Sequence, residues 1–300
     1  MIGKYILSGR VPAILTTATS ALLSLLMPPL AYIISGTVVG LITLRKGAAL
    51  GYQTMLVALL ILLLFSLVAG IPYQLAIGYA LGIWLPVSIC AVVLRWTESQ
   101  GITLMAAGIL AMVFIISMYL LLQDVAGWWR EWFEVMLEKN VPQQDMGRYQ
   151  EALEPAAVLF NAIISVGVML NIMMSVLLAR WWQSRLFNAG AFRQEFFALR
   201  LPSLILPVSG LVVVMTFVTE QPLQGMIRDI LFIMIFMYLV QGVSAVHRVV
   251  DKYGLSSGWL VMMYCMLLLI PQIGVLIACL GMTDVYINWR RKNEPPGTES

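Results

Sequence analysis

Charged side chains are scarce in this sequence. Only 11% of its 300 residues are Asp, Glu, Lys or Arg, whereas 61% are hydrophobic. Soluble domains carry roughly a quarter charged residues, so a chain this apolar could not cover its surface as a soluble fold. The net charge of +3 is small, and the basic residues sit in short loops rather than on one face, which argues against nucleic acid as a partner. We therefore expect an integral membrane protein whose main partner is the lipid bilayer.

Residues that commonly bind metals or act in catalysis are also few. His247 is the only histidine, which excludes most metal sites and proton relays that need several imidazoles. The three cysteines lie inside apolar runs without ligand-like spacing, so we expect no metal site, disulfide or cofactor. The sequence has no G-x-x-x-x-G-K-[ST] loop, and the chain itself should therefore not hydrolyse ATP.

One stretch, Gly254 to Gly258, matches the G-x-S-x-G pattern of hydrolases. In those enzymes the serine stands on a strand-to-helix turn, but here the stretch joins two apolar helices. His247 and Asp251 are near in sequence, yet nothing indicates a base that is positioned by a third group. We interpret the stretch as a glycine-rich helix connection and expect no enzymatic activity.

Long apolar runs dominate the rest of the chain. Most come close to the ~20 residues that a helix needs to cross ~30 Å of hydrocarbon. The predicted fold class is all-α, a polytopic transmembrane helix bundle that forms a single membrane domain over residues 1–292, followed by a disordered polar tail at 293–300. The nine runs are Val11–Met27, Leu30–Leu44, Ala49–Ala69, Ile71–Leu94, Ile102–Leu122, Ala156–Leu178, Leu204–Val218, Ile227–Val246 and Trp259–Met282.

The ninth run has two possible arrangements. A single crossing would place the basic cluster Arg290–Lys292 outside, against the charge rule. Pro271 breaks the run near its middle, so a kinked or re-entrant hairpin is the alternative. Each half of such a hairpin would be too short to span the membrane unaided, and we therefore expect one helix.

The stretch Arg180–Pro202 is the most basic connection between two apolar runs. It holds four arginines against the single acid Glu195, and short loops rich in Lys and Arg stay on the cytoplasmic side during insertion. The loop and the basic N-terminus are therefore predicted to be cytoplasmic. Phe192, Phe196 and Leu199 follow helical spacing, which predicts a short amphipathic helix within the loop.

The segment 123–154 carries seven acids against three basic residues, which suits the outer face. Within it, Trp129, Trp132, Phe133 and Met136 recur at i, i+3, i+4 and i+7, with charges on another face. This spacing predicts an amphipathic helix in the large outer loop. The helix lies either on the membrane with its aromatic side down or over the outer mouth of the bundle.

Neutral polar residues stand within the apolar runs. We single out Asn161, Asn171 and Gln241 as candidates that line a pocket for a small, mostly apolar ligand, although interhelical hydrogen bonds explain them as well. Arg228 and Asp229 lie near an outer helix end. Because charges are nearly absent from the middles of the helices, a proton-driven pump or cation channel is disfavoured.

Small residues recur at four-residue spacing. Ala13, Thr17 and Ala21 line one stripe of the first helix, and Gly36 and Gly40 form a G-x-x-x-G pair. Such residues let helix backbones approach closely, within a chain or between chains. Internal packing is the default interpretation.

Three stretches of the sequence resemble the YybS-like family of predicted bacterial membrane proteins, a domain of unknown function. They are PPLAYIISGTVVGLITLRKGA, LLARWWQSRLFNAGAFRQEFFALRLP and GLSSGWLVMMYCMLLLIPQIGVLIACLGMTDVYINWRRK. The resemblance covers most of the chain. It implies a multi-pass protein of the bacterial inner (cytoplasmic) membrane.

That family is distantly similar to the substrate-binding subunits of energy-coupling-factor vitamin transporters. Those subunits are helical bundles that bind a micronutrient and dock onto a membrane coupling subunit driven by ATPases. The resemblance implies that Ala13, Thr17 and Ala21 form the docking stripe. It also implies that a ligand enters at the outer mouth, under Trp128 to Leu137.

These features together predict a substrate-binding or transport component for an unknown small molecule, with no catalysis of its own. The alternative is a non-catalytic membrane scaffold or assembly factor. A transport component needs an enclosed, partly polar cavity that is reachable from outside, whereas a scaffold can be packed solid.

Overall fold

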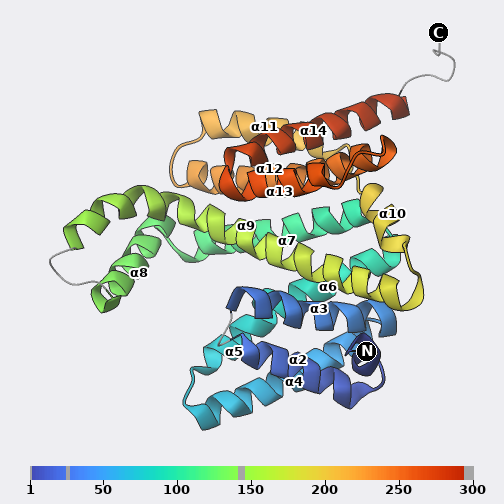
Figure 1. Cartoon of the computed structure of the whole chain (residues 1–300). Helices are drawn as coiled ribbons and strands as arrows, with labels where there is room; N and C mark the ends of the chain where they lie inside the picture. Colours follow the sequence, from blue (N-terminus) through green and yellow to red (C-terminus); the bar gives the residue numbers. More distant parts are fainter. Residues whose placement is uncertain (1, 25–27, 141–145, 294–300) are drawn as a thin grey trace. The chain divides into compact units, whose positions relative to one another are not determined.

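A computed structural model describes residues 2–24, 28–140 and 146–293 of the chain (Figure 1). All regular secondary structure in these residues is helical. The helices up to residue 121 are α1 (Ile2–Ile6), α2 (Arg10–Leu23), α3 (Pro28–Lys46), α4 (Ala48–Ala69), α5 (Tyr73–Tyr79), the π-helix η1 (Ala80–Trp84), α6 (Leu85–Thr97) and α7 (Gln100–Leu121). The later ones are α8 (Val125–Asn140), α9 (Met146–Phe187), α10 (Ala191–Phe197), α11 (Ile205–Val218), α12 (Leu223–Lys252), α13 (Gly258–Leu269) and α14 (Gln272–Asn293).

Several helical stretches are long and apolar enough to cross a membrane. Among the described residues there are five: Ala48–Ala69, Tyr73–Thr97, Gln100–Leu121, Leu153–Phe187 and Leu223–Lys252. Three more apolar stretches are shorter: Ile205–Val218, Gly258–Leu269 and Gln272–Ile287. Their length and composition indicate an all-α, multi-pass membrane protein. They do not confirm the predicted count of nine segments.

The predicted ninth run is not one helix. α13 ends at Leu269, and Ile270 leaves the helical region with φ −132° and ψ 85°. The residue before a proline avoids the α conformation, and Pro271 therefore explains why the helix breaks at Ile270. α13 and α14 contact each other, and both contact α12. The expectation of a single ninth helix is therefore wrong, and the alternative with a break at Pro271 describes this part of the chain.

The chain divides into two compact units. Unit 1 comprises residues 1–107 and 168–201, and unit 2 comprises residues 108–167 and 202–300. Two of the three boundaries fall inside α7 and α9, and the third lies between α10 and α11. The expectation of a single membrane domain over residues 1–292 stays a prediction. From residue 294 onward, the tail expected at 293–300 lies outside the described residues.

The small-residue stripe of α2 lies inside unit 1. Ala13, Thr17 and Ala21 are only 1%, 0% and 3% exposed, and α2 contacts α3 and α4. Ser35 Oγ on α3 donates a hydrogen bond to the carbonyl oxygen of Thr17 at 3.4 Å. The stripe is thus covered by helices of this chain, and a docking partner could reach it only if α2 separated from them.

The glycines of α3 also permit a close approach within unit 1. A Cβ added at Gly36 would lie 2.5 Å from Ser175 Oγ, and one added at Gly40 would lie 3.1 Å from the Cβ of Ala179. Ser175 Oγ donates to the carbonyl oxygen of Ile33 at 3.3 Å. The G-x-x-x-G pair therefore lets α3 lie directly against α9, as small residues at helix interfaces do.

Trp84 lies in the buried core of unit 1. Its side chain is fully buried, and its Nε1 donates to Ser35 Oγ at 2.8 Å. It ends the π-helical turn Ala80–Trp84, two residues before Pro86, which has no N–H to continue the α-helical ladder. The indole belongs to a buried cluster that includes Val39 of α3 and Ala58 and Leu62 of α4.

Replacing Trp84 by phenylalanine should lower the free energy of unfolding by about 1–2 kcal/mol, because the buried Ser35 hydroxyl loses its donor while an aromatic ring remains. Thermal unfolding of the protein in nanodiscs measures this loss. Trp96→Phe is the matched control, since Trp96 is 81% exposed, and it should unfold like the wild type. Equal effects of the two substitutions would contradict this role for the indole N–H.

The predicted helix of the acidic segment is α8, and its aromatic side packs within unit 2. Trp129 is 8% exposed, and its ring lies 4.7 Å from that of Phe160 on α9. Phe133 contacts the same ring, also at 4.7 Å. Met118 of α7 packs against this cluster. Trp132 and Met136 of the same stripe remain 40% and 39% exposed, so these contacts agree with either predicted arrangement.

The basic stretch Arg180–Pro202 is largely helical. α9 continues to Phe187, the chain turns at Gly190 with φ +92°, and α10 follows. The rings of Phe192 and Phe196 stack with centroids 6.1 Å apart. The predicted short helix is confirmed, whereas the first part of the predicted loop is the end of α9.

Candidate functional site

A cavity of about 410 Å³ lies at one end of unit 2. Its walls come from the α7–α8 connection, from α9, and from the α11–α12 connection with the first turns of α12. This volume falls in the range of small-molecule sites, roughly 300–1,000 Å³. Its lining includes Tyr119, Asp124, Asn161, Gln221, Gly225 and Arg228.

Side-chain caps fix the connections that line the cavity. Asp124 Oδ1 accepts a hydrogen bond from the backbone N–H of Gly127 at 2.8 Å, which is the N-cap arrangement at the start of α8. Gln224 Nε2 donates to the carbonyl oxygen of Thr216 at 3.1 Å. This bond joins the last turn of α11 to the first turn of α12, so both connections have defined positions.

A buried carboxylate organises this end of unit 2. Asp229 is 0% exposed and lies about two turns into α12. Its Oδ2 accepts hydrogen bonds from Asn161 Nδ2 at 2.7 Å and from Tyr119 Oη at 3.2 Å. Its Oδ1 accepts from Arg228 Nη2 at 3.0 Å. These bonds satisfy a charge that would be costly to bury alone.

Arg228 links α12 to α9 as well. Its Nη2 donates to the carbonyl oxygen of Val158 at 2.6 Å, and its Nε donates to Asp229 Oδ1 at 3.3 Å. The positive charge of Arg228 is therefore balanced by its neighbour on the same helix. Together with Tyr119 from α7, these contacts bring three helices to one carboxylate.

The side-chain oxygen of Asn161, Oδ1, has no hydrogen-bond partner among the described residues. The residue is 1% exposed, and its Nδ2 is bonded to Asp229. A buried acceptor without a partner costs about 1–3 kcal/mol. Asn161 lines the cavity, but its Oδ1 is itself buried, so a donor in the cavity would bond this oxygen only after the wall shifts.

Of the three candidate pocket residues from the sequence, Asn161 lines this cavity. Gln241 is fully buried, and its Nε2 donates to Asp284 Oδ2 at 2.8 Å. Asp284 Oδ1 accepts from Arg248 Nη2 at 2.8 Å, so Gln241 takes part in an interhelical network between α12 and α14. Asn171 belongs to unit 1, where its Oδ1 is buried without a partner among the described residues.

Tyr119, Arg228 and Asp229 were not among the candidates from the sequence. The available signal was the Arg228–Asp229 pair in an otherwise apolar run, since an ionisable residue in a spanning helix is by default a functional-site hypothesis. The contact with Asn161 joins residues 68 positions apart. Nothing in the spacing of the residues predicts that contact.

Unit 1 has a charged pocket of about 140 Å³, whose lining includes two arginines and two glutamates. Arg180 Nε donates to Glu195 Oε2 at 2.7 Å, Arg180 Nη2 donates to Glu195 Oε1, and Arg180 Nη1 donates to Gln183 Oε1 at 2.6 Å. Arg95 Nη1 donates to the carbonyl oxygen of Leu44 at 3.1 Å. Arg180 and Glu195 thus bind each other, and Arg95 binds the end of α3, so we interpret these contacts as links that hold α9 to α10 and α6 to α3.

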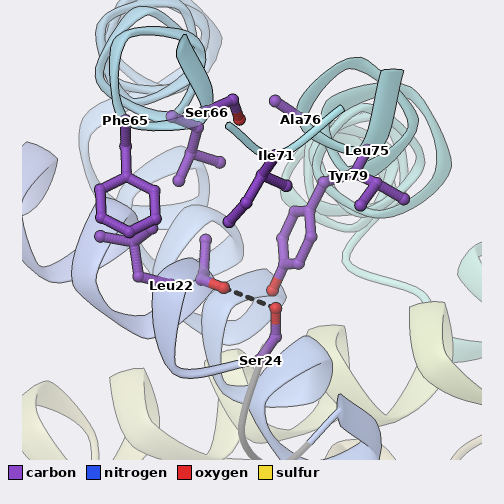
Figure 2. A pocket seen from close by; sticks show the side chains of 10 residues that line it. Leu22, Ser24, Phe65, Ser66, Ile71, Leu75, Ala76 and Tyr79 are labelled. Carbon is purple, nitrogen blue, oxygen red and sulfur yellow. Dashed lines mark hydrogen bonds between the residues drawn. The ribbon is translucent and has the colours of Figure 1, made fainter. Parts of the chain in front are cut away.

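Two other hollows in unit 1 offer little for a polar ligand. The one between α2, α4 and α5 is about 50 Å³, which suits a few water molecules rather than a metabolite. Figure 2 shows the Tyr79 hydroxyl pointing toward Ser24, whose Oγ donates to the carbonyl oxygen of Ala21 at 2.5 Å. The hollow along Leu60–Tyr73 is about 620 Å³, and four of its eight lining residues are leucines, which suits lipid chains.

The G-x-S-x-G stretch lies in the connection between α12 and α13. Ser256 is exposed there, and His247 Nε2 lies 2.8 Å from Tyr264 Oη. Among the residues that the structure describes, no three His, Cys, Asp or Glu side chains are grouped to hold a metal ion. The interpretation of this stretch as a helix connection agrees with its position.

The cavity of unit 2 therefore offers hydrogen-bonding groups held in place by their neighbours. Such an arrangement can orient a small polar molecule in a partly apolar pocket. No family model matches the sequence, and no curated protein or solved structure is significantly similar to it.

Proposed function

We propose that this chain is a membrane protein that binds a small molecule in the cavity of unit 2. It acts as the substrate-binding or transport component of an uptake system and catalyses no reaction itself. The observation that carries the proposal is the buried, unpartnered Oδ1 of Asn161 at the wall of a 410 Å³ cavity. Among the residues that line this cavity, Asn161 is the one with a buried polar atom that has no partner in the described part of the chain.

The predicted topology supports access from outside the cell. The end of α7, the α11–α12 connection and the first turns of α12 line the cavity, and the basic connections predict that these ends face outward. Packing of α8 against the same end places its tryptophans near the lining residues. In this proposal the protein belongs to the bacterial inner membrane. Its partner is a membrane coupling subunit with ATPases, as the YybS-like resemblance implies.

The proposal predicts that the gently purified protein retains a stoichiometric small molecule, which mass spectrometry would identify. Gly225→Leu should reduce the retained amount about tenfold or more, the effect of losing about 1.4 kcal/mol of binding free energy. Gly225 lines the cavity, and a Cβ there would already lie 2.8 Å from Tyr119 Oη. The larger side chain should fill space that the ligand needs.

Gly210→Leu is the matched control, because Gly210 is also helical and a Cβ there meets nothing within 4 Å. This variant should retain the ligand like the wild type, and thermal unfolding should confirm that both variants are folded. Wild-type protein that carries no small molecule, but reproducibly recovers other membrane proteins, would contradict the proposal and favour a membrane scaffold.

A further inference from the structure

We infer that unit 1 binds an anionic phospholipid at the end of α9, where Lys4, Arg45 and Arg185 hold the phosphate of its headgroup. The site is separate from the cavity of unit 2. It therefore goes beyond the proposed function, and its failure would leave that function untouched.

Positive charge is concentrated in unit 1. This unit contains nine Lys or Arg residues and two acids, a formal side-chain charge of +7, whereas the whole chain carries +3. Every charged side chain of unit 1 falls in one of four short segments, which are residues 4–10, 45–46, 95–98 and 180–200. The rest of unit 1 carries no charged side chain.

Segments that are distant in sequence meet at the end of α9. The Cζ of Arg45, in the last turn of α3, lies 4.0 Å from the ring centroid of Phe187, the last residue of α9. A Cβ added at Gly3 would lie 3.2 Å from Trp182 Nε1, so α1, which carries Lys4, packs on the same part of α9. The start of the chain and the ends of α3 and α9 therefore lie together (Figure 1).

The cations at this place keep their hydrogen-bond donors available. The Cζ of Arg185 lies 5.2 Å from the ring centroid of Trp181. Contact with a ring, as for Arg45, uses the charge of a guanidinium rather than its N–H groups. No acid among the described residues pairs with Lys4, Arg45 or Arg185, and all three are exposed. A phosphate can therefore accept hydrogen bonds from them.

The charge balance favours an anionic headgroup over a zwitterionic one. Glu195 is bound by Arg180, and Glu98 lines the same charged pocket. These two acids can balance at most two of the nine basic residues, so this end of unit 1 stays strongly positive. That charge repels the ammonium group of a zwitterionic lipid, whereas phosphatidylglycerol carries no such group.

Apolar side chains at the same place favour a lipid over a soluble phosphate. Ile2, Tyr5 and Phe187 are exposed there. Phe187 also ends the stretch Leu153–Phe187, which is long and apolar enough to cross a membrane, and headgroups lie at the ends of such stretches. Retention of basic loops in the cytoplasm explains the sign of the charges. It does not require three segments to converge on one turn of α9.

The test is native mass spectrometry of the full chain in a mild detergent, titrated with phosphatidylglycerol or with phosphatidylcholine that has the same acyl chains. We expect phosphatidylglycerol to bind about tenfold or more tightly, because several basic side chains act on one anionic headgroup. Glycerol phosphate, the soluble part of that headgroup, should bind at least about tenfold more weakly than the lipid, since it lacks the apolar chains.

The double variant Arg45→Gln, Arg185→Gln should weaken phosphatidylglycerol binding about tenfold and remove most of the preference between the two lipids. The matched control is Lys139→Gln with Lys252→Gln, which removes the same charge from exposed positions in unit 2. It should keep the preference. Thermal unfolding should confirm that both variants are folded, and the comparison of the two lipids on the wild type depends on neither variant.

Equal binding of the two lipids to the wild type would overturn the proposal and leave this end of unit 1 to an acidic segment of another protein. An equal loss of affinity in the two double variants would overturn it as well, because net charge rather than a site would then explain binding. Glycerol phosphate that binds as tightly as the lipid would indicate a soluble anion instead. None of these results bears on the compound retained in unit 2, which Gly225→Leu tests separately.

Discussion

Asp229→Ala should lower the free energy of unfolding by about 3 kcal/mol or more, which is the usual cost of breaking a buried ion pair from one side. The substitution leaves Arg228 without its counter-ion, and it removes the acceptor of Asn161 Nδ2 and Tyr119 Oη. Because the Arg228 side chain is 27% exposed, partial hydration keeps the expected loss near the lower end of the range, about 3–5 kcal/mol. Reversible unfolding in mixed micelles measures the change.

Two controls distinguish this effect from the loss of any acid. Glu220→Ala removes an exposed carboxylate of the α11–α12 connection and should stay within about 0.5 kcal/mol of the wild type. Replacing Arg228 and Asp229 together by leucine should recover much of the lost stability, because an apolar pair leaves no unpaired charge. The account of the site is wrong if the double variant is no more stable than Asp229→Ala.

Gly281→Ala should lower the free energy of unfolding by about 1–3 kcal/mol, the cost of overpacking a close contact. A Cβ at Gly281 would collide with the carbonyl oxygen of Tyr238 and would lie 2.8 Å from the backbone nitrogen of Gly242. Gly242 in turn faces the backbone of Ile277. Because these are backbone atoms, no side-chain rotation relieves the collision, and α14 must move away from α12.

Gly274→Ala is the matched control on the same helix. The nearest atoms to a Cβ at Gly274 are leucine methyl groups at 3.8 and 3.9 Å, so there is room for the methyl group. This variant should match the wild type or gain up to about 1 kcal/mol from the higher helix propensity of alanine. If both alanine variants unfold alike, the close approach of α12 and α14 is not what stabilises this part of unit 2.

Much of the secondary structure could be predicted from the sequence. The length of the apolar runs predicts spanning helices, and the spacing of aromatic residues predicts α8 and α10. The run around Pro271 could not be settled from the sequence, because length and charge gave opposite answers. Contacts of both α13 and α14 with α12 accompany the break, and such contacts are not visible in a linear pattern.

The site could be predicted only in part. A polar residue in an apolar run is visible in the sequence, which is how Asn161 was found, but its partner Asp229 is 68 residues away. The same limit applies to Gln241, whose bond to Asp284 joins two helices. For the stripe with Ala13, small residues indicate a close approach without indicating which helix makes it.

The most direct test of a ligand site in unit 2 is an experimental structure of the protein in nanodiscs with its co-purified compound. The compound should lie in the cavity, with a donor within hydrogen-bonding distance of Asn161 Oδ1, and Gly225→Leu protein should lack it. A compound bound elsewhere, or a cavity closed by side chains from α8 and α9, would contradict the proposed site.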